Sequence, residues 1–431
     1  MKVPRRQAIP TNVAVIGGGV AGISCAYELA EKGFAVTIFE SRRILGGRAS
    51  SFRDSRTGLM LDNSQHVLLG CCRQAKDFFD KLGSGDKITY HDRLNVIDSD
   101  RSVIESSRLP APFHLLGSIM SGELTASINK LTLARVLISM LLIKPSENDA
   151  AADYLLKLGC PSNLIEKLVE PVIESALNES ASAGSAKYAR MVLIEMLLKD
   201  REAYRLGVPD VALSELVHEA ALRRLSELGC RVRLASPVRK LQVQNGLMRS
   251  IETKSGECIS FDQCVVAVPP YILSKMGLEA GGAQQLLWQP IVAAHLFFEK
   301  PIPEFPPACV VGEPFGWVFG KHTQFGYVQA VASAASKLMG LDRDDLQALA
   351  LRAAVRVEPR LADMPLKRSV IYIERRATFA TLACDAHRPQ AATELKNVFL
   401  AGDWVATGWP ATIEGAVRSG KAAANLILAN G

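Results

Sequence analysis

The sequence lacks the residue patterns of the common hydrolytic and metal sites. It has no HExxH motif, no metal-ligand spacing and no Ser, His and Asp in the order of a hydrolytic triad. Its nine cysteines form no CxxC pair, and Cys71 and Cys72 are adjacent. We therefore predict reduced thiols in a cytoplasmic protein, with no metal site and no disulfide framework. Redox chemistry in such a chain needs a bound organic cofactor.

The sequence also lacks long apolar runs and dense charge. No apolar run reaches the roughly 20 residues of a membrane-spanning helix. The arginines of residues 1–7 are followed by no apolar core of signal length, so we expect no export. The formal net charge is only +6 over 431 residues, without a compact polybasic block. We therefore expect no nucleic-acid partner.

What the chain does have is a glycine-rich turn between an apolar run and a helical pattern, at residues 13–22 (VAVIGGGVAG). Gly17 supplies the sharp turn, Gly19 lets the backbone approach a pyrophosphate, and Gly22 lets the helix pack closely on the strand. A second strand ends at Glu40, where an acidic side chain binds a ribose hydroxyl. The sequence therefore predicts a dinucleotide site.

A second glycine pair follows the dinucleotide element and ends in a basic residue. Gly47 and Arg48 offer further N–H groups and a guanidinium to the same diphosphate. This suits a long cofactor that stays bound through turnover. The combination resembles the FAD-dependent amine oxidase and carotenoid desaturase superfamily, in which this glycine, glycine, arginine element follows the dinucleotide fold.

The C-terminal region strengthens the resemblance to that superfamily. A strand ends in Gly402 and Asp403, and residues 408–420 open a terminal helix. In relatives the aspartate lies by the pyrophosphate and ribityl chain. The helix N-terminus faces the flavin ring, where its dipole stabilises negative charge. The residues that this implies at the helix N-terminus are Thr412, Ile413 and Ala416.

Closer resemblance points to one branch of the superfamily. Residues 62–71 (DNSQHVLLGC), 375–380 (RRATFA) and 410–416 (PATIEGA) resemble the squalene-associated, desaturase-like branch. Its characterised activity removes the hydroxyl of hydroxysqualene to give squalene, in hopanoid- or sterol-type isoprenoid biosynthesis. The resemblance implies a hydrophobic isoprenoid substrate, hydroxysqualene, and an electron donor that the sequence does not identify. Ser64 departs from the glycine expected in relatives.

Three other functions are compatible with the same fold. A carotenoid-type, phytoene-like desaturase or isomerase would act on a longer polyene. An FAD-dependent amine oxidase needs an aromatic cage, and only 6% of the residues are aromatic. A non-catalytic prenyl-binding relative would bind FAD poorly, whereas the glycines, Glu40 and Asp403 are all present.

Three side chains are candidates for the chemistry. Departure of a hydroxyl is assisted by a proton donor. His66 and Asp62 lie in a segment that relatives place near the cofactor, and Arg376 precedes the terminal FAD element. The alternatives are a hydrogen-bonded structural histidine and, for Arg376, a salt bridge at a strand edge.

We predict an α/β fold, with a Rossmann-like FAD-binding domain of the amine oxidase type and a discontinuous α+β substrate domain. The FAD-binding domain is expected to comprise residues 1–70, 200–270 and 386–431. The substrate domain is expected to comprise residues 71–199 and 271–385.

The middle segment of the predicted FAD-binding domain, residues 200–270, has a recognisable pattern of helix and strands. The sequence predicts a helix over 211–228, a strand over 230–234 and a buried strand over 264–268. Asn245 and Gly246 predict the two-residue turn of a hairpin. In relatives the residue at Val238 contacts adenine through its backbone.

Residues 131–143 predict a helix that is apolar over most of its circumference, with lysines at both ends. It is either buried in the substrate domain or docks on a membrane beside the substrate entrance, since a thirty-carbon hydrocarbon must come from the membrane. The second alternative implies peripheral association with the inner membrane.

Overall fold

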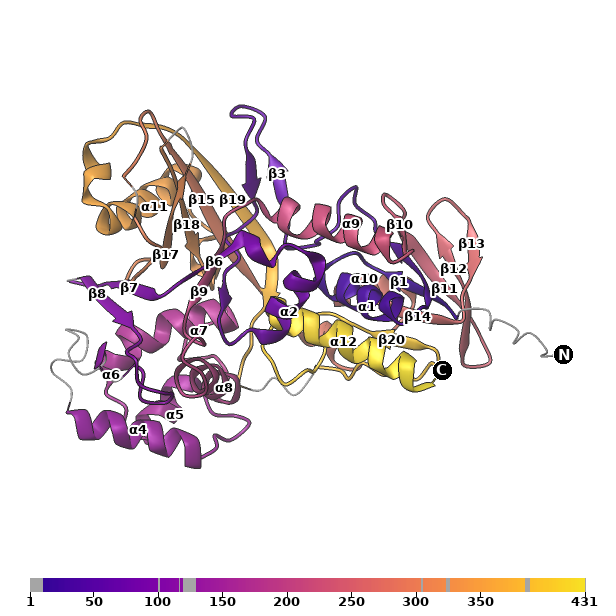
Figure 1. Ribbon diagram of the computed structural model, residues 1–431, viewed down its shortest axis with the longest axis horizontal. Helices are drawn as coiled ribbons and strands as arrows, with labels where there is room; N and C mark the ends of the chain where they lie inside the picture. Colours follow the sequence, from indigo (N-terminus) through magenta and orange to yellow (C-terminus); the bar gives the residue numbers. More distant parts are fainter. Residues whose placement is uncertain are drawn as a thin grey trace.

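The computed structural model describes residues 11–99, 101–115, 117–118, 129–303, 305–322, 326–383 and 388–430. Figure 1 shows a parallel sheet with its helices at the end that carries both chain termini. A larger sheet and a group of helices lie at the opposite end.

Five parallel strands from distant parts of the chain form the first sheet. In sheet order they are β10 (Arg231–Arg233), β2 (Ala35–Phe39), β1 (Asn12–Ile16), β14 (Gln263–Val266) and β20 (Val398–Leu400). Short, nearly continuous apolar runs are typical of parallel strands that are covered on both faces. The predicted Rossmann-like sheet is confirmed, and its last strand comes from the C-terminal region.

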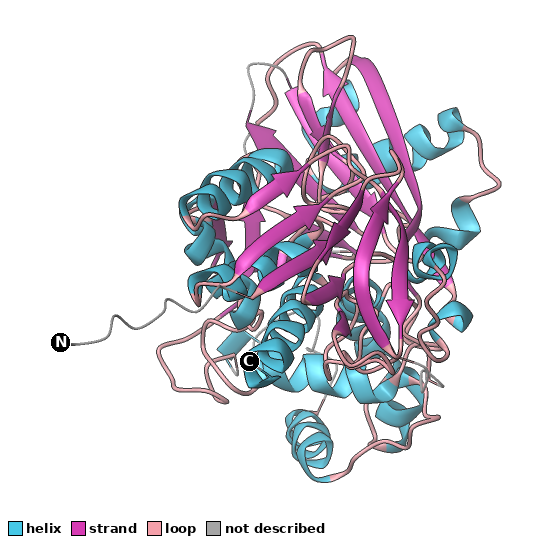
Figure 2. Ribbon diagram, turned by 90° about the vertical axis from the view of Figure 1, so that its right-hand side faces the viewer, coloured by secondary structure: helices cyan, strands magenta, loops and turns pink. Residues whose placement is uncertain are grey.

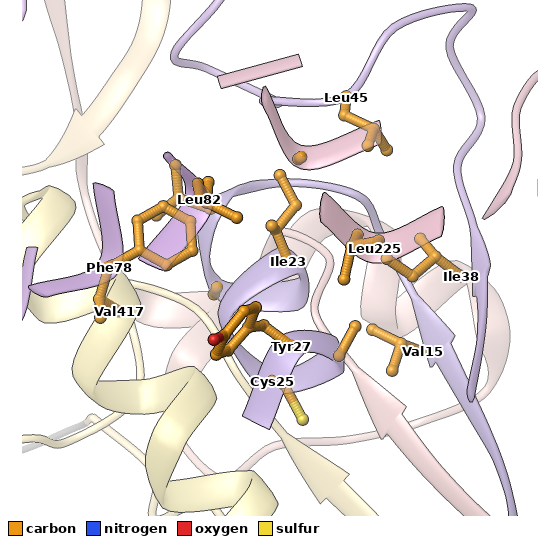
Figure 3. Close-up of a cluster of buried hydrophobic side chains, with 14 of the residues drawn as sticks. Val15, Ile23, Cys25, Tyr27, Ile38, Leu45, Phe78, Leu82, Leu225 and Val417 are labelled. Carbon is orange, nitrogen blue, oxygen red and sulfur yellow. The ribbon is translucent and has the colours of Figure 1, made fainter. Parts of the chain in front are cut away.

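Helices cover one face of this sheet, while the predicted hairpin packs on the other face. Two of the helices pack directly on each other. α1 (Val20–Glu31) lies against α12 (Ile413–Asn430), α2 (Arg73–Leu82) and α9 (Ala220–Glu227). Figure 3 shows Ile23 of α1 between Phe78 of α2 and Leu225 of α9. Because α1 is enclosed on all these sides, nearly all its side chains are buried.

The predicted hairpin is confirmed. β11 (Val238–Gln244) and β12 (Leu247–Thr253) pair antiparallel, and β13 (Cys258–Ser260) extends them to three strands. Asn245 and Gly246 have φ values of 54° and 71°, which are the left-handed values that a tight two-residue hairpin turn requires.

The larger sheet has seven strands and lies at the end of the molecule opposite the chain termini (Figure 1). Figure 2 shows the strands in magenta, with helices beside and below them. In order they are β19 (Leu366–Phe379), β15 (Trp288–Phe298), β18 (Gly326–Ala332), β17 (Trp317–His322), β16 (Ala308–Val310), β7 (Arg93–Ile97) and β8 (Arg101–Glu105). Helix α11 (Arg343–Val357) covers one face of this sheet.

Two small sheets and further helices complete the described part of the chain, and most of these helices pack together as a separate group. The small sheets are β3 (Ser51–Arg53) with β4 (Met60–Asp62), and β5 (Leu68–Leu69), β9 (Leu206–Pro209) and β6 (Ile88–His91). The helices are α4 (Lys130–Leu142), α5 (Ala151–Lys157), α6 (Ser162–Leu164), α7 (Glu170–Leu177), α8 (Ala186–Leu197) and α10 (Pro270–Leu273).

Two predicted helices differ in detail from the structure. The helix predicted over 211–228 begins as a π-helix, Ser214–Glu219, and continues as α9. The helix predicted over 131–143 is α4, and it lies on the surface. Leu131 and Leu142 are each 77% exposed, so full burial of this helix is wrong. In the part of the chain that the structure describes, no helix is long and apolar enough to cross a bilayer.

Candidate functional site

The glycine turn after β1 forms a cradle at the N-terminus of α1. Gly17 has φ +107°, and a Cβ there would lie 2.5 Å from the Ala267 carbonyl oxygen. A Cβ on Gly22 would lie 2.0 Å from the Gly17 oxygen, so both close approaches require glycine. A Cβ on Gly19 would meet nothing within 4 Å, and no side chain caps the helix there. The free N–H groups and the helix dipole therefore face open space that suits a diphosphate.

Glu40 lies buried at the carboxyl end of β2, beside this cradle. Its carboxylate accepts hydrogen bonds from the backbone N–H groups of Gly18 and Arg42, each at 2.7 Å, and from the Ser41 hydroxyl at 3.0 Å. A carboxylate has about four acceptor positions. Glu40 thus fixes the loops on both sides of it and keeps acceptor capacity for a ribose hydroxyl.

The second glycine pair lies directly against the first. The Gly46 N–H donates to the Gly18 oxygen at 2.8 Å, and a Cβ on Gly47 would lie 3.2 Å from the Gly19 Cα. Arg42 holds the pair by donating to the Gly47 oxygen at 2.7 Å. Sequence reasoning missed Arg42, because a surface arginine next to a motif carries no signal of its own.

Arg48 joins this loop to the C-terminal end of the chain. Its guanidinium lies 2.5 Å from the Asp403 carboxylate and donates to the Ala377 carbonyl at 2.9 Å. The predicted residues from the two ends of the sequence therefore meet at one place. Their charges pair with each other, which fixes the position of both.

The loop that contains Asp403 is held from behind by a buried arginine. Arg388 donates to the carbonyl oxygens of Asp403, Val405 and Trp409, at distances of 2.6 to 2.8 Å. At Gly402, with φ +149°, a Cβ would lie 2.3 Å from the Trp404 indole nitrogen. Arg388 belongs to no sequence motif, and sequence reasoning missed it.

The remaining predicted cofactor residues surround the same cradle or flank it. Thr412 caps α12, because its hydroxyl accepts from the Gly415 N–H at 3.2 Å. Ile413 and Ala416 form the first turn of α12 and pack against the core around α1. Val238 starts β11 and packs against the cluster that contains Phe39, beside the end of β2. Their roles toward the cofactor remain predictions.

Asp62 and His66 lie between this cradle and the larger sheet. The Asp62 carboxylate accepts from the Ser51 hydroxyl at 2.7 Å and from the Leu213 N–H at 2.9 Å. His66 donates from Nδ1 to the Ser64 carbonyl at 3.2 Å. Burial lowers the pKa of His66, as does the charge of Arg48, while the Ser64 carbonyl and Asp62 oppose the shift. His66 is therefore a neutral imidazole near neutral pH, beside Arg48.

Arg376 lies further out. Its guanidinium is exposed and lies over the Tyr271 ring, 4.5 Å from the centroid. Tyr271 contacts Trp288 edge-on at 5.5 Å, and Arg48 lies 5.7 Å from the Trp288 centroid. Among the described residues, no hydrogen bond or ion pair joins Arg376 to Asp62 or His66. The predicted catalytic role of Arg376 remains a prediction.

Comparison with known proteins identifies the family. Residues 20–428 match the family described as flavin-containing amine oxidoreductases. The chain belongs to this family. The uncapped N-terminus of α1 and the open space at Gly19 fit the diphosphate of a flavin dinucleotide. FAD is the cofactor of this protein.

Relatives in the family carry two different names. The chain is 31% identical to the hydroxysqualene dehydroxylase of Sinorhizobium fredii, over 97% of this chain and 99% of that one. It is 32% identical to the protein of the same name from Zymomonas mobilis, over 96% and 99%. Identity to a 15-cis-phytoene desaturase of an Oncidium hybrid is 22%, over 98% of this chain and 78% of that one.

Solved structures of low sequence identity confirm the fold. A putrescine oxidase structure superposes with a TM-score of 0.69 at 15% identity, covering 98% of this chain and 99% of that one. An oxidoreductase from Methanosarcina mazei gives a TM-score of 0.70 at 12% identity, covering 95% and 99%. The predicted combination of a Rossmann-like part with a second, discontinuous α+β part is thereby confirmed.

Proposed function

We propose that the protein is an FAD-dependent hydroxysqualene dehydroxylase. The observation that carries the proposal is full-length identity of 31% and 32% to two proteins of that name. The phytoene desaturase relative is more distant, at 22%. A desaturase therefore remains the second candidate and becomes one arm of the test.

The reaction replaces an allylic hydroxyl by hydrogen. The C–O bond breaks, a hydride forms the new C–H bond, and the hydroxyl takes a proton and leaves as water. Reduced FAD, when bound, supplies the hydride, and an external electron donor must reduce it again. The chain supplies the cradle, an apolar enclosure for the hydrocarbon and a proton for the leaving hydroxyl.

We assign the proton transfer to His66. Its Nδ1–H donates to the Ser64 carbonyl, so the proton for the substrate comes from Nε2–H of the charged imidazolium form. Asp62 positions this segment by binding Ser51 and Leu213. Arg376 is the third proposed participant, at the aromatic rings next to Arg48.

We also propose that α4 docks on the membrane surface that delivers the substrate. Five apolar side chains at or just after this helix are at least half exposed: Leu131 77%, Ile138 57%, Leu141 50%, Leu142 77% and Ile143 52%. Lys130, Arg135 and Lys144 are exposed beside them and suit anionic headgroups. An exposed apolar patch of this kind is typical of an interaction surface.

The inner side of α4 supports this placement. Val136 and Met140 are buried in the same cluster as Trp409, which lies in the loop that Arg388 holds beside the cofactor site. Arg190 and Tyr154 bind the last carbonyls of the helix, at Met140, Leu141 and Ile143. The helix is thus fixed from within while its outer face stays apolar.

The proposal also assigns the bounds of the two domains and the location of the protein in the cell. We assign residues 1–70, 200–270 and 386–431 to cofactor binding and residues 71–199 and 271–385 to the substrate. We place the protein in the cytoplasm, peripherally bound to the inner membrane through α4.

The test is a single-turnover competition. The purified protein is expected to be yellow, with about one FAD per chain that acid releases. After anaerobic chemical reduction, one sample is mixed with hydroxysqualene in detergent micelles and flavin reoxidation is followed. Samples with oxidised FAD are mixed anaerobically with phytoene or with a polyamine, because desaturation and amine oxidation would both reduce the flavin. Reoxidation with hydroxysqualene alone, with squalene as product, supports the proposal. Reduction of the oxidised flavin by the polyamine, or no reoxidation by hydroxysqualene, contradicts the proposal. Reduction of the oxidised flavin by phytoene without reoxidation by hydroxysqualene identifies a desaturase.

A further inference from the structure

The two faces of the larger sheet differ in chemistry. Side chains alternate between the faces of a strand. On β15 and β18, Leu296, Val328 and Ala330 point into the apolar cluster under α11. The opposite face carries His295 and Gln329, which are fully buried, in the middle of the same two strands.

Strand register gathers four polar side chains on that second face. His295 pairs with Gln329 across β15 and β18, and Lys321 of β17 pairs with Tyr327 of β18. Tyr327 and Gln329 are two residues apart on β18, so both cross-strand pairs lie on the same face of the sheet. His295 Nδ1 lies 2.7 Å from the Tyr327 hydroxyl. We call these four residues the polar row.

Three buried atoms of the polar row have no partner in the part of the chain that the structure describes. They are Nε2 of His295 and both amide atoms of Gln329. Buried polar groups are nearly always hydrogen-bonded, because a group that loses its hydrogen bonds to water and gains none in the protein destabilises the folded state. A side chain that leaves both its donor and its acceptor unpaired points to a ligand.

The surroundings of the polar row are apolar and lie on the side of the candidate site. Phe319 and Val331 on this face pack against Leu206, Val208 and Val67. Phe52 contacts His295 edge-on at 6.3 Å between ring centroids. Burial lowers the pKa of Lys321 and raises the pKa of Tyr327. Asp62, four residues before His66, is near enough for its charge to oppose the first shift and add to the second.

We propose that Gln329 and His295 bind the hydroxyl group of the substrate and so select an alcohol over a hydrocarbon. This rests on the proposed dehydroxylase function. The Tyr327 hydroxyl donates to Nδ1 of His295, which leaves Nε2–H as a donor to the substrate oxygen, and the Gln329 carbonyl accepts the hydroxyl hydrogen. A small polar row within an apolar enclosure matches a thirty-carbon chain with one hydroxyl. A substrate without that hydroxyl leaves the buried atoms unpaired.

Binding to the oxidised holoenzyme tests this, because oxidised FAD has no hydride to give and the alcohol stays intact. Hydroxysqualene and squalene are titrated in detergent micelles while the flavin absorbance is followed. The wild type is expected to prefer the alcohol by roughly 10- to 100-fold. Gln329→Leu should lose most of this preference and keep its FAD. Gln242→Leu, on the distant strand β11, is the matched control and should keep the preference.

A melting experiment separates recognition from a structural role. Removing unpaired buried amide atoms should leave the melting temperature of the substrate-free Gln329→Leu holoenzyme unchanged or raise it. A lowered melting temperature together with an unchanged preference shows that the amide is structural and overturns the inference. If the wild type itself binds squalene as tightly as hydroxysqualene, the proposed function fails as well. A wild-type preference that survives in Gln329→Leu overturns only the role of Gln329.

Discussion

Arg48 and Asp403 form an ion pair of 2.5 Å between residues 355 positions apart. The aspartate is almost fully buried, whereas the arginine side chain keeps 31% of its exposure. Each residue lies in a loop that borders the cofactor cradle. The pair therefore closes the cradle between the first and the last segment of the fold.

The first prediction concerns this pair. Arg48→Ala and Asp403→Ala should each lower the free energy of unfolding by about 1–3 kcal/mol, less than for a fully buried pair because water screens Arg48. The double variant should lose less than the sum of the two. Denaturation of the apoproteins measures all three. Additive losses would show that the two charges do not interact.

The second prediction concerns Glu40. Glu40→Ala should weaken FAD binding by about 1.5–3 kcal/mol, the usual value of a hydrogen bond to a charged group. Glu40→Gln keeps an acceptor oxygen for the Gly18 N–H and should lose less. Flavin fluorescence titration of the apoprotein gives the dissociation constants. Equal affinity in all three proteins would exclude Glu40 from the ribose site.

The third prediction concerns proton transfer. His66→Ala should slow flavin reoxidation by hydroxysqualene by roughly 10²–10⁴-fold while FAD stays bound. As a proton donor the imidazole acts in its charged form, and its pKa is lowered from 6.5. The single-turnover rate of the wild type should therefore fall as pH rises through that lowered pKa. The variant should show a flat profile, and a wild-type rate independent of pH from 5 to 8 would exclude this role.

The fourth prediction concerns acid stability. Burial lowers the pKa of His295 from 6.5 to about 4. Above pH 6.5 the imidazole is neutral in both states, and below it only the unfolded chain takes up the proton. The folded state should therefore lose about 3 kcal/mol as pH falls from 6.5 to 4. Denaturant titrations at several pH values should show a shallower slope for His295→Gln, whereas half-buried His91→Asn should change it less.

The fifth prediction concerns membrane docking. Ile138→Asp and Leu142→Asp on α4 should each weaken binding to anionic vesicles about tenfold or more, since burial of one such side chain contributes about 1.5–3 kcal/mol. FAD content and melting temperature should not change, because both side chains are exposed. Val243→Asp, 46% exposed on the hairpin at the other end of the molecule, is the matched control (Figure 1). Equal vesicle binding by all four proteins, measured by flotation, would contradict docking.

The sequence predicts the cofactor half of the molecule well, because local rules govern it. Gly17 and Gly22 stand where the backbone leaves no room for a Cβ, and Asn245 with Gly246 encodes a turn within two residues. The polar row and Arg388 could not be predicted in this way. Their roles arise from strand register and from contacts with distant carbonyls, which no short motif records.

The parallel sheet has a further consequence for how the protein is made. β20 pairs with β14, and α12 crosses α1 at Gly420, where a Cβ would lie 2.3 Å from the Ala21 oxygen. A ribosome adds about 5–20 residues per second, so roughly 20–80 s pass between synthesis of β1 and of β20. During that time the nascent chain contains the glycine turn after β1, but β20 and α12, which complete the sheet and cover α1, have not yet been made. Stable flavin loading should therefore be a post-translational event, and a nascent chain stalled before residue 398 should emerge colourless.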